Sequence, residues 1–195
     1  MVVMLLAEGF EEIEAVYPID VLRRCGIEVK TVAVNGNAPN RGNCQLSTVN
    51  CQLFVTGANG ITIKPDTQLN QIEHTKIQML ILPGGPGRTN IQKSEKAMDL
   101  IRNCHKSGVP IAAICGAPEI LGELGILKGK RATCYPGLQD KLTGAEFTDA
   151  PVVIDENLIT SQAAGTSEVF AFAIAEFLCG KEKADEIRSR MLCRS

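Results

Sequence analysis

Short, almost wholly apolar runs recur along the chain and predict strands that are buried on both faces of a sheet. Continuous apolarity over four to eight residues is typical of the inner strands of a parallel sheet. The runs are Val2–Ala7, Ile27–Val34, Gln78–Leu82 and Val109–Ile114.

Segments with a helical pattern lie between these runs. In Glu11–Arg24 apolar residues recur three apart, which predicts a helix that ends before Gly26. Ser94 is positioned to cap a second helix that extends to about Lys106, with Gly108 after its end. Further helices are predicted directly after Cys115, over Thr166–Leu178 up to Gly180, and over about Lys183–Leu192.

Two regions depart from this alternation. Asn35–Gly60 is rich in Gly, Asn and Thr and predicts a hairpin or an ordered excursion, which Ile61–Ile63 closes. Val152–Ile154 and Leu158–Ser161 predict a second hairpin. The remaining alternation of strand and helix predicts one α/β domain over residues 1–195, with a doubly wound, mostly parallel sheet sandwiched by helices.

Composition excludes several classes of partner. The net charge is −2, and the chain has no Trp and two Tyr, which disfavours nucleic-acid binding. No stretch is long and apolar enough for a membrane span. The apolar start is too short for an export signal and lacks a basic flank. Eight cysteines without any CxxC pair favour the reduced cytoplasm and indicate no metal site.

Cys115 is the strongest candidate for chemistry. It follows the apolar run Val109–Ile114, and Gly116, Ala117 and Pro118 come directly after it. A cysteine between a strand and a helix meets the unpaired N–H groups of the helix, which favour a thiolate. The same layout holds the nucleophile of serine hydrolases. The alternative is a buried cysteine that serves only packing.

Glycines after the strand Gln78–Leu82 are expected at the same edge of the sheet. Gly84 and Gly85 lack the spacing of a phosphate-binding loop, but they would bring backbone N–H groups close to Cys115. Together with the N–H of Gly116 they would form an oxyanion hole. The alternative is an ordinary flexible turn.

A partner base for Cys115 is not obvious. His74 and His105 are the two histidines, and both lie in segments expected at the surface, which argues against a Cys–His protease or an amidotransferase. Glu14 lies among apolar residues of the first predicted helix, where burial near a thiolate would raise its pKa and let it carry a proton. The alternative is a surface glutamate in an acidic helix start.

Five segments of the chain resemble those of a known family. The segments Ala7–Glu14, Ile19–Arg24, Leu82–Gly85, Ala112–Pro118 and Thr160–Ser167 look like those of the ThiJ/PfpI superfamily. They look closest to its branch with the parkinsonism-associated protein deglycase and bacterial ThiJ-type relatives. The resemblance implies a flavodoxin-like fold, a homodimer and no cofactor. It implies an oxidisable nucleophile at Cys115, a protonated partner at Glu14, backbone amides at Gly85 and Gly116, and pocket positions at Gly84, Tyr135 and Ala164.

Two positions depart from the family. Tyr135 stands where human-like members have a histidine, so no imidazole is available there, and the tyrosine either closes the pocket or donates its O–H. The segment Asn37–Leu53, with Cys44 and Cys51, is longer than expected and either changes the dimer edge or is a loop. Arg24 lies in a region that resembles the dimer interface; otherwise it is a solvated cation at a helix end.

Two functions are consistent with these residues. The first is a glyoxalase III-like lyase or protein deglycase that acts on methylglyoxal, glyoxal or early glycation adducts through a hemithioacetal at Cys115. The second is a non-enzymatic sensor or chaperone of oxidative stress, in which Cys115 is oxidised to a sulfinate. Both use Cys115 and Glu14, so sequence does not separate them. A role in thiazole biosynthesis rests only on a family label.

Overall fold

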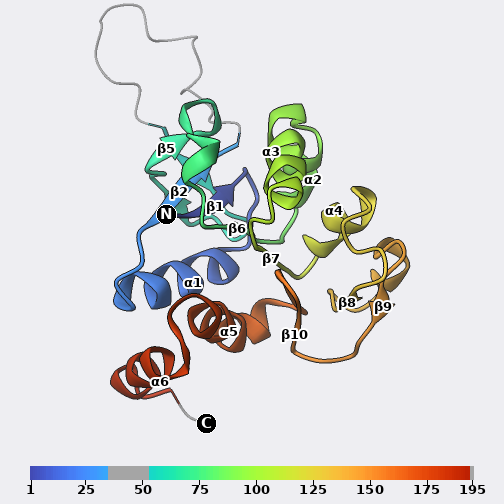
Figure 1. Cartoon of the computed structure of the whole chain (residues 1–195). Coiled ribbons are helices and arrows are strands. Elements are labelled where there is room, and N and C mark those ends of the chain that lie inside the picture. The colour runs from blue at the N-terminus through green and yellow to red at the C-terminus, as the bar shows by residue number, and fades with distance from the viewer. Residues whose placement is uncertain (35–52, 194–195) are drawn as a thin grey trace, which may run out of the picture.

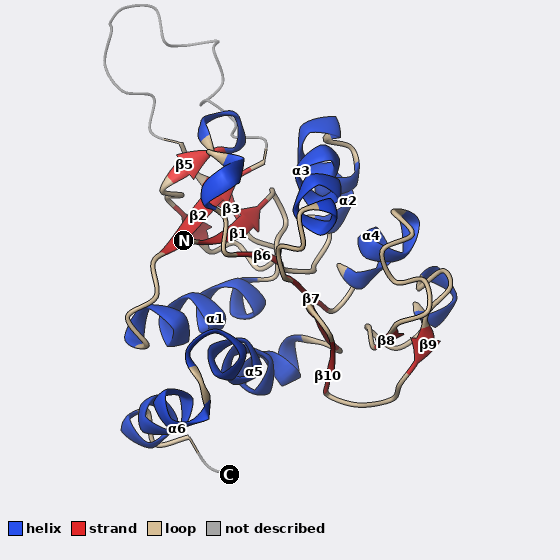
Figure 2. Cartoon of the chain, in the orientation of Figure 1, coloured by secondary structure: helices blue, strands red, loops and turns tan. Residues whose placement is uncertain are grey.

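A seven-stranded sheet with helices on both faces forms the centre of the structure, a computed structural model that describes residues 1–34 and 53–193 (Figure 1 and Figure 2). Its strand order is β10-β11-β7-β6-β1-β2-β5, and every pairing is parallel except that of β10 with β11. The strands are β1 (Val2–Leu6), β2 (Val29–Ala33), β5 (Thr67–Gln68), β6 (Met79–Leu82), β7 (Ile111–Ile114), β10 (Val152–Asp155) and β11 (Leu158–Ser161).

The order of the five inner strands is that of flavodoxin. Taken along the chain as first to fifth, β1, β2, β6, β7 and β11 lie in the order 2-1-3-4-5. The predicted flavodoxin-like, doubly wound sheet is therefore confirmed. All four predicted inner strands are present, each one to three residues shorter than predicted, and the predicted hairpin Val152–Ser161 is the antiparallel pair β10–β11.

Alternate residues of β1 point to opposite layers, which explains why the run is apolar at every position. Val2, Met4 and Leu6 pack into one cluster with the helices on the lower side of Figure 1. Val3 and Leu5 pack into the cluster beneath the other helices. The lower layer holds α1 (Glu12–Arg24), α5 (Ser167–Cys179) and α6 (Lys181–Arg190), and the upper layer holds α2 (Arg88–Gln92), α3 (Glu95–Lys106) and α4 (Pro118–Glu123).

Single residues explain where several helices begin and end. The Ser94 side chain accepts a hydrogen bond from the N–H of Ala97 at 3.3 Å and begins α3, as predicted. Gly180, with φ of 85°, separates α5 from α6, because a left-handed conformation is open to glycine and ends the first helix. Within the described ranges, no helix is long and apolar enough to cross a membrane.

The shortest elements were not predicted. They are β5, α2, the parallel pair β8 (Arg131–Ala132) and β9 (Glu146–Phe147), and several single 3₁₀ turns. Two-residue strands are too short to show an alternating pattern, so tertiary contacts alone define them. The predicted closing strand Ile61–Ile63 is present as β4 (Thr62–Ile63), antiparallel to β3 (Val55–Thr56). Residues 35–52 of the longer segment, with Cys44 and Cys51, lie outside the described residues.

Candidate active site

Three loops meet at the carboxyl edge of the sheet, where ligands of this fold type bind. One follows β1 and leads into α1, one follows β6, and the third follows β7 and contains Cys115. Because β1, β6 and β7 are parallel neighbours, their carboxyl ends are adjacent. This topology brings Glu14, Gly84 and Cys115 together from distant parts of the sequence.

Cys115 has a backbone conformation that is unusual for a residue with a side chain. Its φ is 64°, in the left-handed region that usually requires glycine. Two hydrogen bonds hold it there: its N–H donates to the carbonyl of Ser161 at 2.9 Å, and its carbonyl accepts from the N–H of Tyr135 at 2.8 Å. A strained residue between a strand and a helix is the arrangement of a nucleophile elbow, as the sequence predicted.

Gly84 separates Cys115 from Glu14 and is the residue that lets them approach. A Cβ atom on Gly84 would lie 2.7 Å from the Cβ of Cys115 and 2.9 Å from Oε2 of Glu14, too close for any side chain. The N–H of Gly84 donates to the same Oε2 at 2.8 Å. Gly85, the next residue, has φ of 75° and lies against the carbonyl of Gly9. At both positions the neighbouring atoms therefore leave room only for glycine.

Glu14 is fully buried, with 0% of its surface exposed. Burial raises the pKa of its carboxyl from 4.5 to about 7; the hydrogen bonds from Gly84 and Cys115 oppose this shift, and the charge of Glu11 adds to it. Within the described part of the chain, no N–H or O–H group donates to the other oxygen of Glu14, Oε1. The Cys115 thiol is the neighbouring polar group. Glu14 is thus a buried acid that can hold a proton near neutral pH.

The Cys115 thiol differs from the prediction in the direction of its pKa. Burial, and then the charge of Glu14 and the hydrogen bond to it, raise this pKa to about 12, whereas the amides of Gly85 and Gly116 act to lower it. The predicted stabilisation of a thiolate by backbone N–H groups is present, but burial of the thiol, together with the Glu14 carboxylate, outweighs it. Since Glu14 loses its proton near pH 7 and the thiol near pH 12, the two groups together hold one proton between these values.

A cavity of about 350 Å³ opens above the Cys115 sulfur. Arg88, at the start of α2, forms one wall: its Nε lies 3.3 Å from Oε2 of Glu119, and its NH1 donates to the carbonyl of Gly85 at 3.3 Å. The lining residues are Gly85, Pro86, Arg88, Cys115, Gly116, Tyr135, Pro136, Gly137 and Leu138.

Arg88 was not singled out from the sequence. A cation on the first residue of a helix opposes the usual preference for acidic residues there, and that mismatch is the signal that could have found it. A Cβ on Gly116 would lie 2.7 Å from Cδ of Arg88, so Gly116 gives the arginine its place beside Cys115. The cavity therefore has a positive charge next to the nucleophile, balanced by Glu119.

The other residues considered in the sequence analysis lie either at the rim of the cavity or away from it. Tyr135 lines the cavity and is 49% exposed, so it forms part of the rim. Ala164 lies in a 3₁₀ turn before α5 and is not one of the lining residues. Arg24 lies at the exposed end of α1, with its Nε 2.8 Å from Oδ2 of Asp20, and its place in a dimer interface stays a prediction. His105 is exposed on α3.

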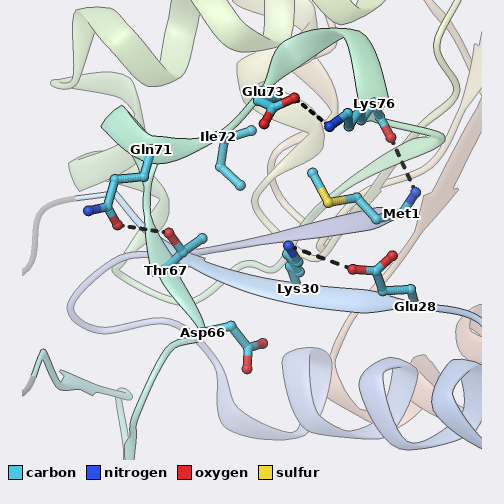
Figure 3. Close-up of a pocket in the computed structure, with 9 residues that line it drawn as sticks. All are labelled: Met1, Glu28, Lys30, Asp66, Thr67, Gln71, Ile72, Glu73 and Lys76. Carbon is cyan, nitrogen blue, oxygen red and sulfur yellow. Dashed lines mark hydrogen bonds and ion pairs between the residues drawn. The ribbon is translucent and has the colours of Figure 1, made fainter.

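A larger cavity, of about 720 Å³, lies away from Cys115 (Figure 3). Its charged groups pair with each other: Lys76 lies 2.7 Å from Glu73, and Lys30 lies 3.6 Å from Glu28. Across residues 1–34 and 53–193, no cluster of three His, Cys, Asp or Glu side chains could hold a metal ion. Cys115 lines the smaller cavity, and the buried carboxyl of Glu14 lies behind it across Gly84, so the smaller cavity is the candidate active site.

Comparison with known proteins gives consistent matches over nearly the whole chain. The profile of the DJ-1/PfpI family matches residues 1–177. The chain is 38% identical over 192 residues to Protein dj-1beta of Drosophila melanogaster, covering 97% of this chain and 95% of that protein. It is 32% identical over 166 residues to a protein of Pyrococcus abyssi named a deglycase, covering 84% and 90%. The crystal structure of Drosophila melanogaster DJ-1beta superposes with a TM-score of 0.87 at 36% identity, covering 100% of this chain and 98% of that one.

Proposed function

Since the chain belongs to the DJ-1/PfpI family, we propose that it is a cofactor-independent, cysteine-dependent enzyme of the deglycase and glyoxalase type. Its substrates are methylglyoxal, glyoxal or early glycation adducts. The observation that carries the proposal is the approach of Cys115 to the buried Glu14 across Gly84. A nucleophile beside a neutral carboxylic acid is the equipment needed to add to a carbonyl and then move a proton.

The reaction begins when the single proton of the pair resides on Glu14, because the sulfur is then a thiolate. The thiolate attacks the aldehyde carbon of methylglyoxal and forms a hemithioacetal. The amides of Gly85 and Gly116, which already donate toward the sulfur, are close enough to stabilise the adjacent oxyanion. As the oxyanion takes up the proton, Glu14 becomes a carboxylate.

Glu14 then acts as a base and as an acid in turn. Its carboxylate removes the proton from the former aldehyde carbon, giving an enediolate. The hydroxyl proton passes to the neighbouring oxygen, and Glu14 returns its own proton to the carbon that bears that oxygen. The product of this transfer is a thioester of lactate on Cys115. Water cleaves the thioester, releases lactate and restores the thiol, so methylglyoxal and one water give lactate with no net oxidation. A carboxyl with a pKa of about 7 is suited to both directions of transfer.

A redox sensor is the second candidate function. The groups that surround the sulfur, namely the amides of Gly85 and Gly116 and the carboxyl of Glu14, would also hydrogen-bond the oxygens of a cysteine sulfinate. Turnover separates the two functions, because a sensor consumes no aldehyde.

The decisive experiment is methylglyoxal consumption with lactate detection by freshly reduced protein. We expect lactate from the wild type and a loss of more than a hundredfold in Cys115→Ser and Glu14→Gln. Glu123→Gln, an exposed change on α4, is the matched control and should keep full activity. Absence of turnover in the wild type would sink the enzyme proposal. A gain of two oxygens at Cys115 under mild peroxide would then support the sensor.

The proposal includes a homodimer. Ile13 and Val16 lie on the outer face of α1 and are 47% and 45% exposed. Ile61, outside this helix, is 58% exposed. The N–H of Ile61 donates to Oε1 of Glu12 at 3.3 Å, so all three apolar side chains lie on one region of the surface. Light scattering should give twice the chain mass for the wild type and the chain mass for Ile13→Glu. A monomeric wild type would contradict this part of the proposal.

A further inference from the structure

Two cysteines lie at corresponding ends of neighbouring helices, away from the candidate active site. Cys25 directly follows α1, and Cys179 is the last residue of α5. The helices lie side by side on the lower layer (Figure 1). Each begins beyond the carboxyl end of a strand, β1 for α1 and β11 for α5, and these strands are parallel within the sheet. Both helices therefore run back along the sheet in the same direction, and their last turns meet.

The two thiols are neighbours at these helix ends, and neither is deeply enclosed. Cys179 is one of the groups that act on the pKa of Cys25, and both side chains are partly exposed. Cys179 also donates from its Sγ to the carbonyl of Ala175 at 3.0 Å. Cys25 packs at the edge of the apolar cluster formed by the lower helices. Two accessible thiols at adjacent ends of packed helices can form a disulfide when the sulfurs approach to bonding distance.

We propose that Cys25 and Cys179 form a reversible disulfide that joins the end of α1 to the end of α5. The oxidant is a hydroperoxide or glutathione disulfide. With hydrogen peroxide, the Cys25 thiolate attacks one peroxide oxygen, forming a sulfenic acid and releasing water. The Cys179 sulfur then attacks the Cys25 sulfur and expels the second water. The two thiols lose two hydrogens in total, and the peroxide accepts both of their electrons.

The backbone at both positions can absorb the small movement that a disulfide requires. A disulfide brings the two sulfurs to about 2.05 Å from each other. Gly26 follows Cys25 with φ of 81°, and Gly180 follows Cys179 with φ of 85°. No heavy atom outside the chain neighbours lies within 4 Å of a Cβ built on either glycine, so each helix end adjoins open space. The two glycines themselves therefore do not obstruct a small shift of either helix end.

The environment of the pair sets its reactivity. Burial and the neighbouring thiol raise the pKa of Cys25 to about 11, while Lys183 acts to lower it. Cys25 lies at the C-terminus of α1, where the helix dipole disfavours a thiolate. Oxidation should therefore be slow at neutral pH and faster as pH rises.

The test uses the full chain carrying Cys115→Ser, so that the active-site cysteine cannot contribute. The protein is incubated with glutathione disulfide, remaining thiols are alkylated, and peptides are mapped by mass spectrometry. We expect one linked peptide pair, Cys25 with Cys179, that dithiothreitol separates. The link should be absent after a further Cys25→Ser or Cys179→Ser change. It should persist in Cys104→Ser, the control at a buried cysteine on α3.

A second measurement does not depend on the folding of a variant. Joining residues 25 and 179 closes most of the chain into a loop, so oxidation should raise the melting temperature by several degrees, and dithiothreitol should reverse the rise. Alkylation of both thiols after oxidation would overturn the proposal. So would glutathione mixed disulfides alone, a link between two chains, or a link from Cys25 to another cysteine. Failure of methylglyoxal turnover would leave this proposal intact, since the pair lies at the far end of α1 from Glu14.

Discussion

Replacing Glu14 with glutamine should make the protein progressively more stable than the wild type as pH rises. The carboxyl has a pKa of about 7 in the folded chain, against an ordinary value of 4.5. The folded state therefore binds the proton more tightly than the unfolded state does. Its stabilising contribution is fully present below pH 4.5 and is lost as pH rises through 7. Glutamine has nearly the same shape and does not ionise, so the variant escapes this loss.

The size of the effect follows from the two pKa values. A difference of about 2.5 between them corresponds to about 3.4 kcal/mol, since each pKa unit is worth about 1.4 kcal/mol. Glu14 is fully buried, so solvent does not screen this contribution. The free energy of unfolding of Glu14→Gln minus that of the wild type should increase by about 3 kcal/mol between pH 4 and pH 8. The upper limit stays below the range in which Cys115 titrates.

Urea denaturation of both proteins at half-unit steps of pH measures this difference. Glu123→Gln, an exposed change of the same kind, should follow the wild type at every pH. The assignment of a raised pKa to Glu14 would be refuted if the free energy of unfolding of Glu14→Gln minus that of the wild type stayed constant within about 1 kcal/mol over this pH range. A difference that decreases with pH would show that Glu14 is stabilised as a carboxylate.

Three further changes test the geometry of the site. Gly84→Ala places a Cβ 2.7 Å from that of Cys115 and should lower kcat/KM by about a hundredfold or more, measured as methylglyoxal turnover. Arg88→Ala removes the pairing with Glu119 and one cavity wall, and should raise KM about tenfold with a smaller change in kcat; an unchanged KM would exclude Arg88 from substrate binding. Tyr135→Phe should keep kcat within about threefold, because a half-exposed rim residue is not the base of the proposed reaction; a loss near that of Glu14→Gln would show that its hydroxyl takes part.

The sheet and the position of Cys115 could be predicted from the sequence because each depends on a local pattern of residues. Buried inner strands are apolar at every position, and Cys115 lies directly between such a strand and the helix that Pro118 begins. The strand order follows from the alternation of strand and helix together with the family resemblance. Elements of two residues, such as β8 and β9, have no period of their own, and only their partner defines them.

The roles of the acidic residues on the first helix could not be separated in the same way. Glu11, Glu12 and Glu14 look alike in a helix start. Once α1 docks on the sheet, Glu14 faces Gly84, whereas Glu12 is also buried and accepts from the N–H of Asn59 at 2.7 Å. The expectation of a lowered thiol pKa was wrong for the same reason. The burial that contributes most to the raised pKa of Cys115, and the Glu14 charge that adds to it, both depend on residues that are distant in sequence.

The central claim is that Cys115 and Glu14 act as one unit that shares a single proton. The most direct test is the rate of alkylation of Cys115 by iodoacetamide from pH 5 to pH 10, in the wild type and in Glu14→Gln. The account predicts that wild-type reactivity rises first near pH 7 to a plateau, and that a second rise begins toward the upper limit. In Glu14→Gln the first step should be absent. A single rise with the same midpoint in both proteins would contradict the claim.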